Sequence, residues 1–247
     1  MKNHITSSSE ATEAPLQHPW DRCITVGRGY DLLRADLQDH LRFLQREIGY
    51  RHIRFHASFH DDVGVVHRQE GGSIVYRWTQ LDRIYDFLID AGFDPIVEIN
   101  PMPAALASGD QTMFWYKMNV TPPRDYGAWQ NFLRAWLEHF VERYGRERMR
   151  KWYFEVWNEP NLRNQFWTGD RAEYYRLYQS CAEVVKAVDP QFPVGGPSGA
   201  GAEWNLDFAQ HCREHSIPVD FISYHSYPQN EAGTPREEAL AKREQGA

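Results

Sequence analysis

Residues 152–162 read Trp-Tyr-Phe-Glu-Val-Trp-Asn-Glu-Pro-Asn-Leu, an aromatic and apolar run that stops at Asn158-Glu159-Pro160. The run predicts a buried strand over 152–157, because aromatic and β-branched residues favour strands. Pro160 fixes the turn that follows, which places Glu159 at the strand's carboxyl end. A carboxylic acid among tryptophans at such a position suits a proton donor to a glycosidic oxygen. The alternative is an exposed loop glutamate, but the eleven-residue context favours the proton donor.

Strand-like and helix-like segments alternate on both sides of this run. Further strands are predicted at 23–26, 50–55, 95–99, 193–195 and 219–224. Between them lie apolar stripes with helical spacing, such as Leu33, Leu37, Leu41, Leu44 and Ile48. Thr79 and Asp82 resemble a capping box at the start of one helix. The glycine- and serine-rich segment 196–201 is predicted to be a turn.

Strict alternation of strands and helices indicates a parallel sheet, either doubly wound or closed into a barrel. No GxGxxG or P-loop motif follows any predicted strand. Polar and aromatic residues instead follow the strands one after another: His56, Glu98, Asn158, Glu159, His225 and Tyr227. Functional groups at the carboxyl ends of successive strands are typical of barrel enzymes. We therefore predict a (β/α)8 TIM barrel of the α/β class that is incomplete, with about six of its eight units present.

The domain boundaries follow from composition. Residues 1–20 are predicted to be a disordered N-terminal tail, 21–228 the partial barrel, and 229–247 a polar tail after strand six. A net charge of -7 argues against nucleic acid as a partner. We found no apolar run of membrane-spanning length and no signal-peptide core. Three widely spaced cysteines form neither a disulfide framework nor a zinc motif. We expect a cytoplasmic protein without a membrane partner, metal or cofactor.

Two histidines are candidates for the substrate pocket. His56 and His225 each end a predicted strand. A histidine in that position is either a core side chain bonded to a carbonyl or a pocket residue. Two of them at carboxyl ends favour the pocket.

Other polar and aromatic groups have a structural alternative as well. Glu98 lies inside a strand, where a buried carboxylate needs a partner, and we expect an ion pair with an arginine such as Arg54. Asp61-Asp62 is weak evidence for a metal site, and turn chemistry explains it better. Phe114 and Trp115 lie in a long loop and either wall a sugar site or anchor the loop; the sugar site is slightly favoured.

Taken together, these segments resemble glycoside hydrolase family 39, the family of β-xylosidases and α-L-iduronidase, from about Arg34 to Pro228. The resemblance is carried by Arg54-Phe55-His56, Asp61-Asp62, Val97-Glu98, Phe114-Trp115, Lys151 to Leu162, Val194-Gly195-Gly196-Pro197 and Asp220 to Pro228. It implies a retaining hydrolase acting on an oligosaccharide, most simply a β-D-xylosidase. Glu159 would be the acid/base, and Asn158 would contact the sugar. The remaining pocket residues implied are His56, His225, Tyr227, Phe114 and Trp115.

One part of the family pattern is missing from the sequence. The family's nucleophile is a glutamate at the end of strand seven, and we find no strand-seven pattern. Glu237 and Glu238 lie in the polar tail, where no strand would hold them about 5 Å from the acid. We therefore expect the nucleophile to be absent from the chain and the isolated chain to be weakly active or inactive.

Two other functions stay open. The first is a non-catalytic carbohydrate-binding remnant, and the second is another clan A glycosidase such as an arabinofuranosidase or iduronidase. An unclosed barrel would leave strand edges free, so a homo-oligomer is also possible.

Overall fold

The structure is a computed structural model that describes residues 19–227. The predicted tails at 1–18 and 228–247 lie outside the described residues. Residues 19 and 20, assigned above to the N-terminal tail, belong to a short 3₁₀ helix, η1 (Pro19–Asp21).

A six-stranded parallel sheet forms the centre of the molecule. Its strands are β1 (Cys23–Arg28), β2 (His52–His56), β5 (Asp94–Ile99), β8 (Tyr153–Val156), β9 (Val194–Ala200) and β10 (Phe221–His225). They lie side by side in chain order, and every neighbouring pair is parallel. Within residues 19–227, β1 and β10 are the edges of this sheet. The result is six units of a (β/α)8 barrel that is not closed, as the alternation predicted.

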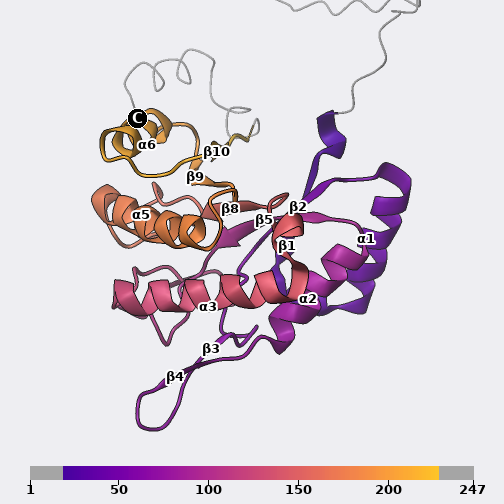
Figure 1. Ribbon diagram of the computed structural model, residues 1–247, viewed down its shortest axis with the longest axis horizontal. Helices are drawn as coiled ribbons and strands as arrows, with labels where there is room; N and C mark the ends of the chain where they lie inside the picture. The colour runs from indigo at the N-terminus through magenta and orange to yellow at the C-terminus, as the bar shows by residue number, and fades with distance from the viewer. Residues whose placement is uncertain (1–18, 228–247) are drawn as a thin grey trace, which may run out of the picture.

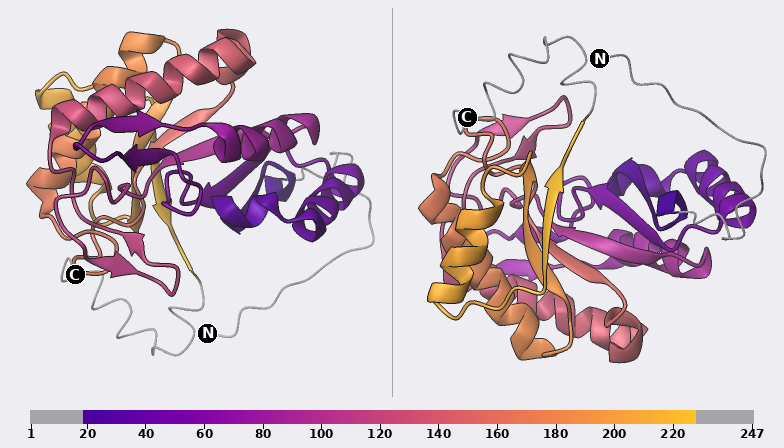
Figure 2. Two further views of the ribbon diagram at one scale, coloured as in Figure 1. Left: turned by 90° about the horizontal axis from the view of Figure 1, so that it is seen from below. Right: turned by 90° about the horizontal axis from the view of Figure 1, so that it is seen from above.

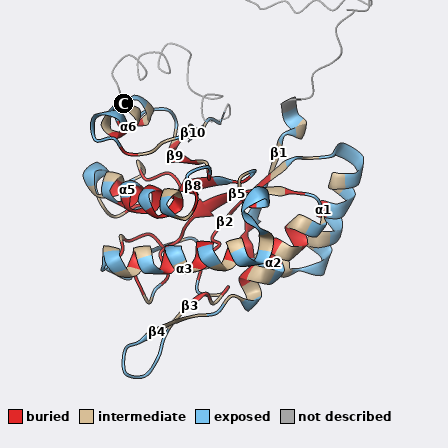
Figure 3. Ribbon diagram, in the orientation of Figure 1, coloured by how far each residue is buried: buried red, intermediate tan, exposed pale blue. Residues whose placement is uncertain are grey.

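Helices connect the strands and pack around the sheet (Figure 2). They are η2 (Gly29–Leu33), α1 (Ala35–Ile48), α2 (Thr79–Asp90), α3 (Tyr126–Tyr144), α4 (Arg146–Met149), α5 (Arg171–Val188) and α6 (Asn205–Glu214). Each long helix has buried residues on one side and exposed residues on the other, whereas the central strands are mostly buried (Figure 3). The core therefore lies between the sheet and the helices, and aromatic rings fill much of it, including Phe59, Trp129, Phe132 and Trp136.

The N-terminal caps of two helices, α5 and α2, differ in kind. Asp170 caps α5 because its carboxylate accepts a hydrogen bond from the Glu173 backbone N–H at 2.8 Å. The capping box predicted at Thr79 and Asp82 is wrong. The N-cap of α2 is Trp78, and no side-chain capping bond forms there. The Asp82 carboxylate instead lies 2.7 Å from His139 Nε2 on α3. A contact between two helices therefore takes the place of the local capping bond that the sequence predicted for Asp82.

A second correction concerns residues 196–201, which we predicted to be a turn. Strand β9 runs on through this segment to Ala200. A Cβ atom on Gly196 would lie 2.7 Å from the Tyr174 hydroxyl oxygen on α5. The absence of a side chain here thus allows close approach of α5, a use of glycine that sequence composition does not separate from turn formation.

Two long connections contain hairpins that the sequence did not reveal. The loop after β2 holds β3 (Val66–Arg68) and β4 (Ile74–Tyr76), which project away from the body of the molecule (Figure 1). The loop after β5 holds β6 (Thr112–Met113) and β7 (Met118–Asn119). Phe114, Trp115 and Tyr116 lie at the tip of this second hairpin.

Candidate active site

The backbone after β8 holds Glu159 in a fixed position. Strand β8 ends at Val156, and Trp157 and Glu159 then adopt φ angles of 72° and 49°. This left-handed region is unfavourable for residues other than glycine, so surrounding contacts must maintain it. One such contact is the hydrogen bond from the Glu159 backbone N–H to the Ser198 carbonyl at 2.8 Å. Glu159 is 9% exposed, and the predicted alternative of an exposed loop glutamate is wrong.

The Glu159 carboxylate contacts a histidine from another strand. His225, the last residue of β10, lies with Nδ1 2.7 Å from Glu159 Oε1. The other ring nitrogen, Nε2, lies 3.2 Å from the Ser198 hydroxyl. His225 is therefore bound through both nitrogens, on one side by the carboxylate and on the other by β9.

Arg54, in β2, connects four strands beneath the site. Its guanidinium lies 2.7 Å from Glu98 Oε1 and 2.7 Å from Glu155 Oε2. It also donates to Asn158 Oδ1 at 3.2 Å and to Ser198 Oγ at 2.9 Å. The predicted ion pair between Glu98 and Arg54 is present. Burial by itself would lower the pKa of Arg54, but Glu98 and Glu155 outweigh it and raise that pKa, so the guanidinium stays charged.

Glu98 also binds His56. Its Oε2 lies 2.8 Å from His56 Nδ1 and accepts from Asn100 Nδ2 at 2.7 Å. Burial would raise the pKa of the Glu98 carboxyl, yet Arg54, His56 and Asn100 together lower it. The negative charge of Glu98 raises the pKa of His56 against the opposing effect of burial. His56 is thus held by a carboxylate that is fully buried.

Aromatic side chains surround the Glu159 loop. Trp157 and Trp167 are buried and meet edge to face at 5.0 Å between ring centroids. Trp157 Nε1 donates to the Phe166 carbonyl at 2.7 Å. Phe114, at the hairpin tip, packs edge to face on Phe166 at 5.4 Å. The β6–β7 hairpin is therefore joined to the segment that follows Glu159.

The predicted aromatic pocket residues are more exposed than the histidines. Trp115 is 81% exposed, and Tyr227 is 51% exposed with its ring 6.3 Å from that of His225. Trp115 and Tyr116 face the Arg28 guanidinium at 5.0 and 4.7 Å from their ring centroids. Arg28 in turn pairs with Asp62. Sequence reasoning missed this arginine–aromatic cluster, because Arg28 and the hairpin are distant in the chain.

Asp61 and Asp62 have structural partners. Both Asp61 oxygens accept from the Ala104 backbone N–H at 3.2 Å, and Asp62 binds Arg28. These partners lie 43 and 34 positions away along the chain, so tertiary contacts and not only a local turn hold the two carboxylates. Within residues 19–227, no group of three or more His, Cys, Asp or Glu side chains is arranged to hold a metal ion.

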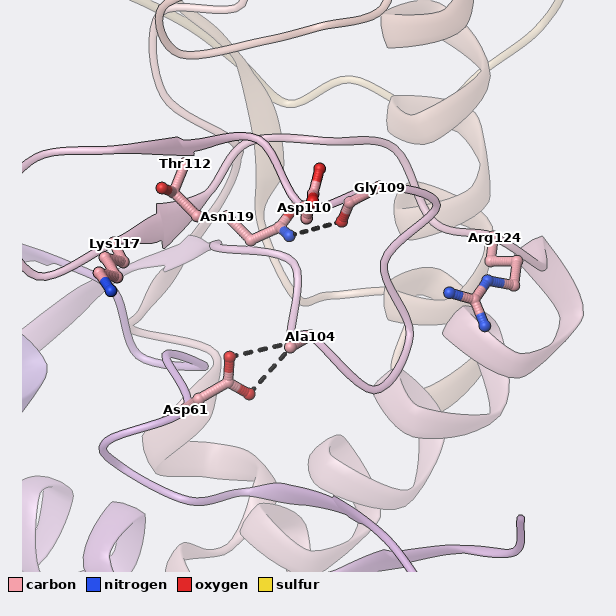
Figure 4. A pocket seen from close by; sticks show the side chains of 8 residues that line it. All are labelled: Asp61, Ala104, Gly109, Asp110, Thr112, Lys117, Asn119 and Arg124. Atoms are coloured by element: carbon pink, nitrogen blue, oxygen red, sulfur yellow. Dashed lines mark hydrogen bonds between the residues drawn. The ribbon is translucent and has the colours of Figure 1, made fainter.

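A cavity of about 430 Å³ lies beside the β6–β7 hairpin (Figure 4). Its lining includes Asp61, Asp110, Lys117 and Arg124, with Asn119 donating to the Gly109 carbonyl at 2.9 Å. Glu159 is not part of the lining. The cavity is therefore not the candidate active site itself.

Three residues of the site were missed by sequence reasoning: Glu155, Ser198 and Asn100. Glu155 carried a usable signal, because a carboxylate in the middle of an apolar strand requires a buried partner. Ser198 and Asn100 carried none, since serine and asparagine next to glycine and proline are ordinary loop residues.

Across the described part of the chain, no helix is long and apolar enough to span a lipid bilayer.

Comparison with known proteins identifies the family. The model for glycosyl hydrolases family 39 matches residues 3–246. A β-xylosidase of Geobacillus stearothermophilus is 46% identical over 213 residues, which are 84% of this chain and 42% of that protein. A β-xylosidase of Caldicellulosiruptor saccharolyticus is 39% identical over 230 residues, 92% of this chain and 47% of that protein.

Solved structures agree with the sequence comparisons. A crystal structure described as a monomeric β-xylosidase from Caulobacter crescentus superimposes with a TM-score of 0.81 at 43% identity, over 84% of this chain and 42% of that one. A bacterial orthologue of human α-L-iduronidase, with a TM-score of 0.64 at 21% identity over 90% of this chain and 37% of that one, shares the fold. The chain spans less than half the length of the two β-xylosidases from Geobacillus and Caldicellulosiruptor. Its fold is thus part of a TIM-barrel hydrolase, and the chain belongs to glycosyl hydrolases family 39.

Proposed function

We propose that this chain provides the acid/base half of a retaining β-xylosidase that removes terminal β-linked xylose from oligosaccharides. The observation that carries the proposal is the setting of Glu159. It follows the fourth barrel strand, is largely buried, and has one carboxylate oxygen bound by His225. The β-xylosidases at 46% and 39% identity support the choice of substrate.

In the proposed mechanism, Glu159 acts twice. Its carboxylic acid first donates a proton to the glycosidic oxygen as that bond to the anomeric carbon breaks. A second carboxylate attacks the anomeric carbon and forms a glycosyl ester. Glu159, now ionised, then accepts a proton from the water that hydrolyses the ester, which restores both carboxyl groups to their starting states.

Asn158 is proposed to orient the sugar. Its Oδ1 accepts from Arg54, which fixes which way the amide faces. The amide NH₂ is then directed away from the guanidinium and can donate to a sugar hydroxyl. His56, His225, Tyr227, Phe114 and Trp115 are proposed to line the same pocket, with the two histidines nearest the buried network.

The nucleophile is proposed to come from outside residues 19–227. Two buried carboxylates lie near Glu159 in sequence or space, Glu98 and Glu155, and Arg54 binds both of them. A carboxylate neutralised by a buried arginine is a poor nucleophile, because attack would leave the guanidinium without its partner. We propose in addition that Glu237 and Glu238, for which the sequence predicts no strand to hold them, do not serve as the nucleophile, so that residues 1–247 alone hydrolyse xylosides weakly or not at all.

The test completes the barrel with a related segment. Residues after Tyr227 are replaced by the corresponding C-terminal part of the Geobacillus β-xylosidase. Hydrolysis of a nitrophenyl β-xyloside and of xylobiose is then compared between this chimera and the 247-residue chain. We expect turnover from the chimera only. Activity of the shorter chain at the chimera's level would overturn the assignment of an external nucleophile.

Glu159→Gln in the chimera tests the acid/base role. Loss of a general acid should lower kcat/KM for xylobiose by about 10²–10⁴-fold. The loss should be smaller for a dinitrophenyl xyloside, whose leaving group needs no proton. Glu138→Gln, at an exposed position on α3, is the matched control. Equal activity of Glu159→Gln and the control on xylobiose would refute the acid/base assignment. If the chimera binds xylose in calorimetry but does not hydrolyse xylosides, the chain is a non-catalytic carbohydrate-binding remnant.

The proposal includes a cytoplasmic location, as expected from the sequence, and self-association, which the structure supports as follows. Strand β10 lies at the edge of the described sheet, with Ile222 and Tyr224 exposed by 40% and 54%. An open strand edge with apolar side chains favours pairing with another copy. A sizing column should therefore show the 247-residue chain as an oligomer, and a sharp monomer peak would contradict this.

A further inference from the structure

We propose that Ser198 is a positioning residue that fixes the tautomer of His225 and thereby decides which oxygen of Glu159 carries the catalytic proton. The inference rests on the proposed function only for the use made of that proton. The hydrogen-bond argument itself concerns Arg54, Ser198, His225 and Glu159, and it holds whatever the substrate.

The first step is the direction of the hydrogen bonds at Ser198. Arg54 Nη2 lies 2.9 Å from Ser198 Oγ. A guanidinium has only donors, so the hydroxyl oxygen must be the acceptor in this bond. The single hydroxyl hydrogen of Ser198 then remains for His225 Nε2, which lies 3.2 Å away.

The second step carries this direction to Glu159. A ring nitrogen that accepts a hydrogen bond bears no proton, so Nε2 of His225 is unprotonated. Neutral imidazole then has its proton on Nδ1. That nitrogen lies 2.7 Å from Glu159 Oε1, so the histidine donates to the carboxyl group and Oε1 is the acceptor.

Two other proton arrangements fit the positions less well. An imidazolium at His225 would share Ser198 with the Arg54 guanidinium and place a second cation beside it. A neutral ring protonated on Nε2 would make Ser198 accept two hydrogen bonds and leave its own hydrogen without an acceptor. Ser198 is fully buried, so water is not available to take that hydrogen, and an unsatisfied buried group is costly.

The backbone keeps Ser198 and Glu159 in register. Ser198 has a φ of 54°, and its carbonyl accepts from the Glu159 N–H at 2.8 Å. Two residues on, Asn161 and Ala200 exchange a pair of hydrogen bonds at 2.9 Å each, which join the same loop to β9. The backbone therefore holds the Ser198 hydroxyl and the Glu159 carboxyl group at fixed positions relative to each other. The direction of the hydrogen bonds from Ser198 to His225 and from His225 to Glu159 is set before any substrate binds.

The consequence for catalysis is that Oε2 alone exchanges the proton. Oε1 accepts from His225 both when Glu159 is protonated and when it is ionised. The acidic hydrogen is therefore confined to Oε2 in the first step, and the same oxygen accepts the proton of water in the second. Without the Ser198 hydroxyl, the proton of neutral His225 would be free to move to Nε2. Nδ1 would then accept a hydrogen bond from the Glu159 carboxylic acid, which would draw the acidic proton away from the substrate.

The test measures the tautomer directly. The full 247-residue chain is labelled with ¹⁵N-histidine, and the His225 signals are assigned with His225→Gln. In the unmodified chain at pH 7 we expect a pyridine-like signal from Nε2 and a pyrrole-like signal from Nδ1. Ser198→Ala should reduce the ratio of this form to all others by about fivefold, the effect of one net hydrogen bond.

Ser180→Ala is the matched control, because Ser180 is a buried serine on α5 whose hydroxyl has no hydrogen-bond partner in the described structure. A protonated Nε2 in the unmodified chain would overturn the inference even if Ser198→Ala fails to fold. An unchanged His225 signal in a folded Ser198→Ala would overturn it as well. The measurement needs no substrate, so an inactive chimera would refute the proposed function and leave this result standing.

Discussion

Replacement of Arg54 by methionine tests whether the buried charge network stabilises the barrel. Methionine is unbranched and apolar, so it replaces the alkyl stem of arginine while removing the charged guanidinium. Glu98 is fully buried and Glu155 is 3% exposed. Both would lose the cation that lies 2.7 Å from each of them. The variant therefore leaves Glu155 without its cation and Glu98 with only His56 and Asn100, and it also removes the Arg54 hydrogen bonds to Asn158 and Ser198.

The expected cost is about 3–5 kcal/mol at pH 7, the range for breaking one buried ion pair. The two pairs share one guanidinium, so their costs do not add. A domain of this kind has a free energy of unfolding of about 5–15 kcal/mol, and the loss would be a large part of it. Arg171→Met is the matched control: Arg171 and Asp207 form an ion pair that is more than half exposed, and its loss should cost less than about 1 kcal/mol.

The pH dependence gives the prediction a sign. In the unmodified chain the pKa of Glu98 is lowered, so its contribution to stability is present above its unfolded value of 4.5 and is lost as the pH falls through the folded value. In Arg54→Met, burial is opposed only by His56 and Asn100, so the pKa of Glu98 should be higher than in the unmodified chain. As the pH falls from 7 to 5, Glu98 of the variant takes up a proton and its buried charge is removed. The difference in free energy of unfolding between the unmodified chain and Arg54→Met should therefore be smaller at pH 5 than at pH 7.

The assay is urea denaturation of both variants and the unmodified chain at pH 7 and pH 5, followed by circular dichroism. Equal slopes with urea concentration would show that the midpoints report stability and not a changed denatured state. A difference below about 1 kcal/mol at pH 7, within the range of an exposed pair, would refute the reasoning. So would a difference that stays the same at pH 5.

Two further predictions concern stability. His56→Asn should lower the free energy of unfolding by about 1.5–3 kcal/mol below pH 6.5, the value for a hydrogen bond to a charged group. Because Glu98 raises the pKa of His56, this difference should disappear as the pH rises through the raised value; a constant difference in pH-dependent melts would contradict it. Asp170→Ala should cost about 1 kcal/mol through loss of the α5 cap, whereas Thr79→Ala should be nearly neutral in the same melts because the Thr79 side chain caps nothing.

Much of the barrel followed from local patterns. The alternation in β2 predicted which face is buried, since burial repeats with the period of the element, and Ile53 and Phe55 are buried. The stripe on α1 did so in part, with Leu41 buried and Ile48 41% exposed. The sequence 152–159 likewise predicted a strand that delivers Glu159 to its carboxyl end, because an aromatic run followed by Asn-Glu-Pro has few other structures. The Glu98–Arg54 pair was predictable on energetic grounds, since a carboxylate in a buried strand must be neutralised.

The rest depended on which strands become neighbours. Residues 196–201 looked like a turn because glycine serves both turns and close packing, and only the position of Tyr174 on α5, 2.7 Å from where a Cβ atom on Gly196 would lie, decides between them. Hydrogen bonds from Ser198 to His225 and from Arg54 to Ser198 join residues 27 and 144 positions apart. Periodicity along the chain records how deeply a residue is buried but not what it meets there. The sequence alone therefore determined the order of elements and the acid at the end of the fourth strand, and the tertiary structure decided which groups hold that acid in place.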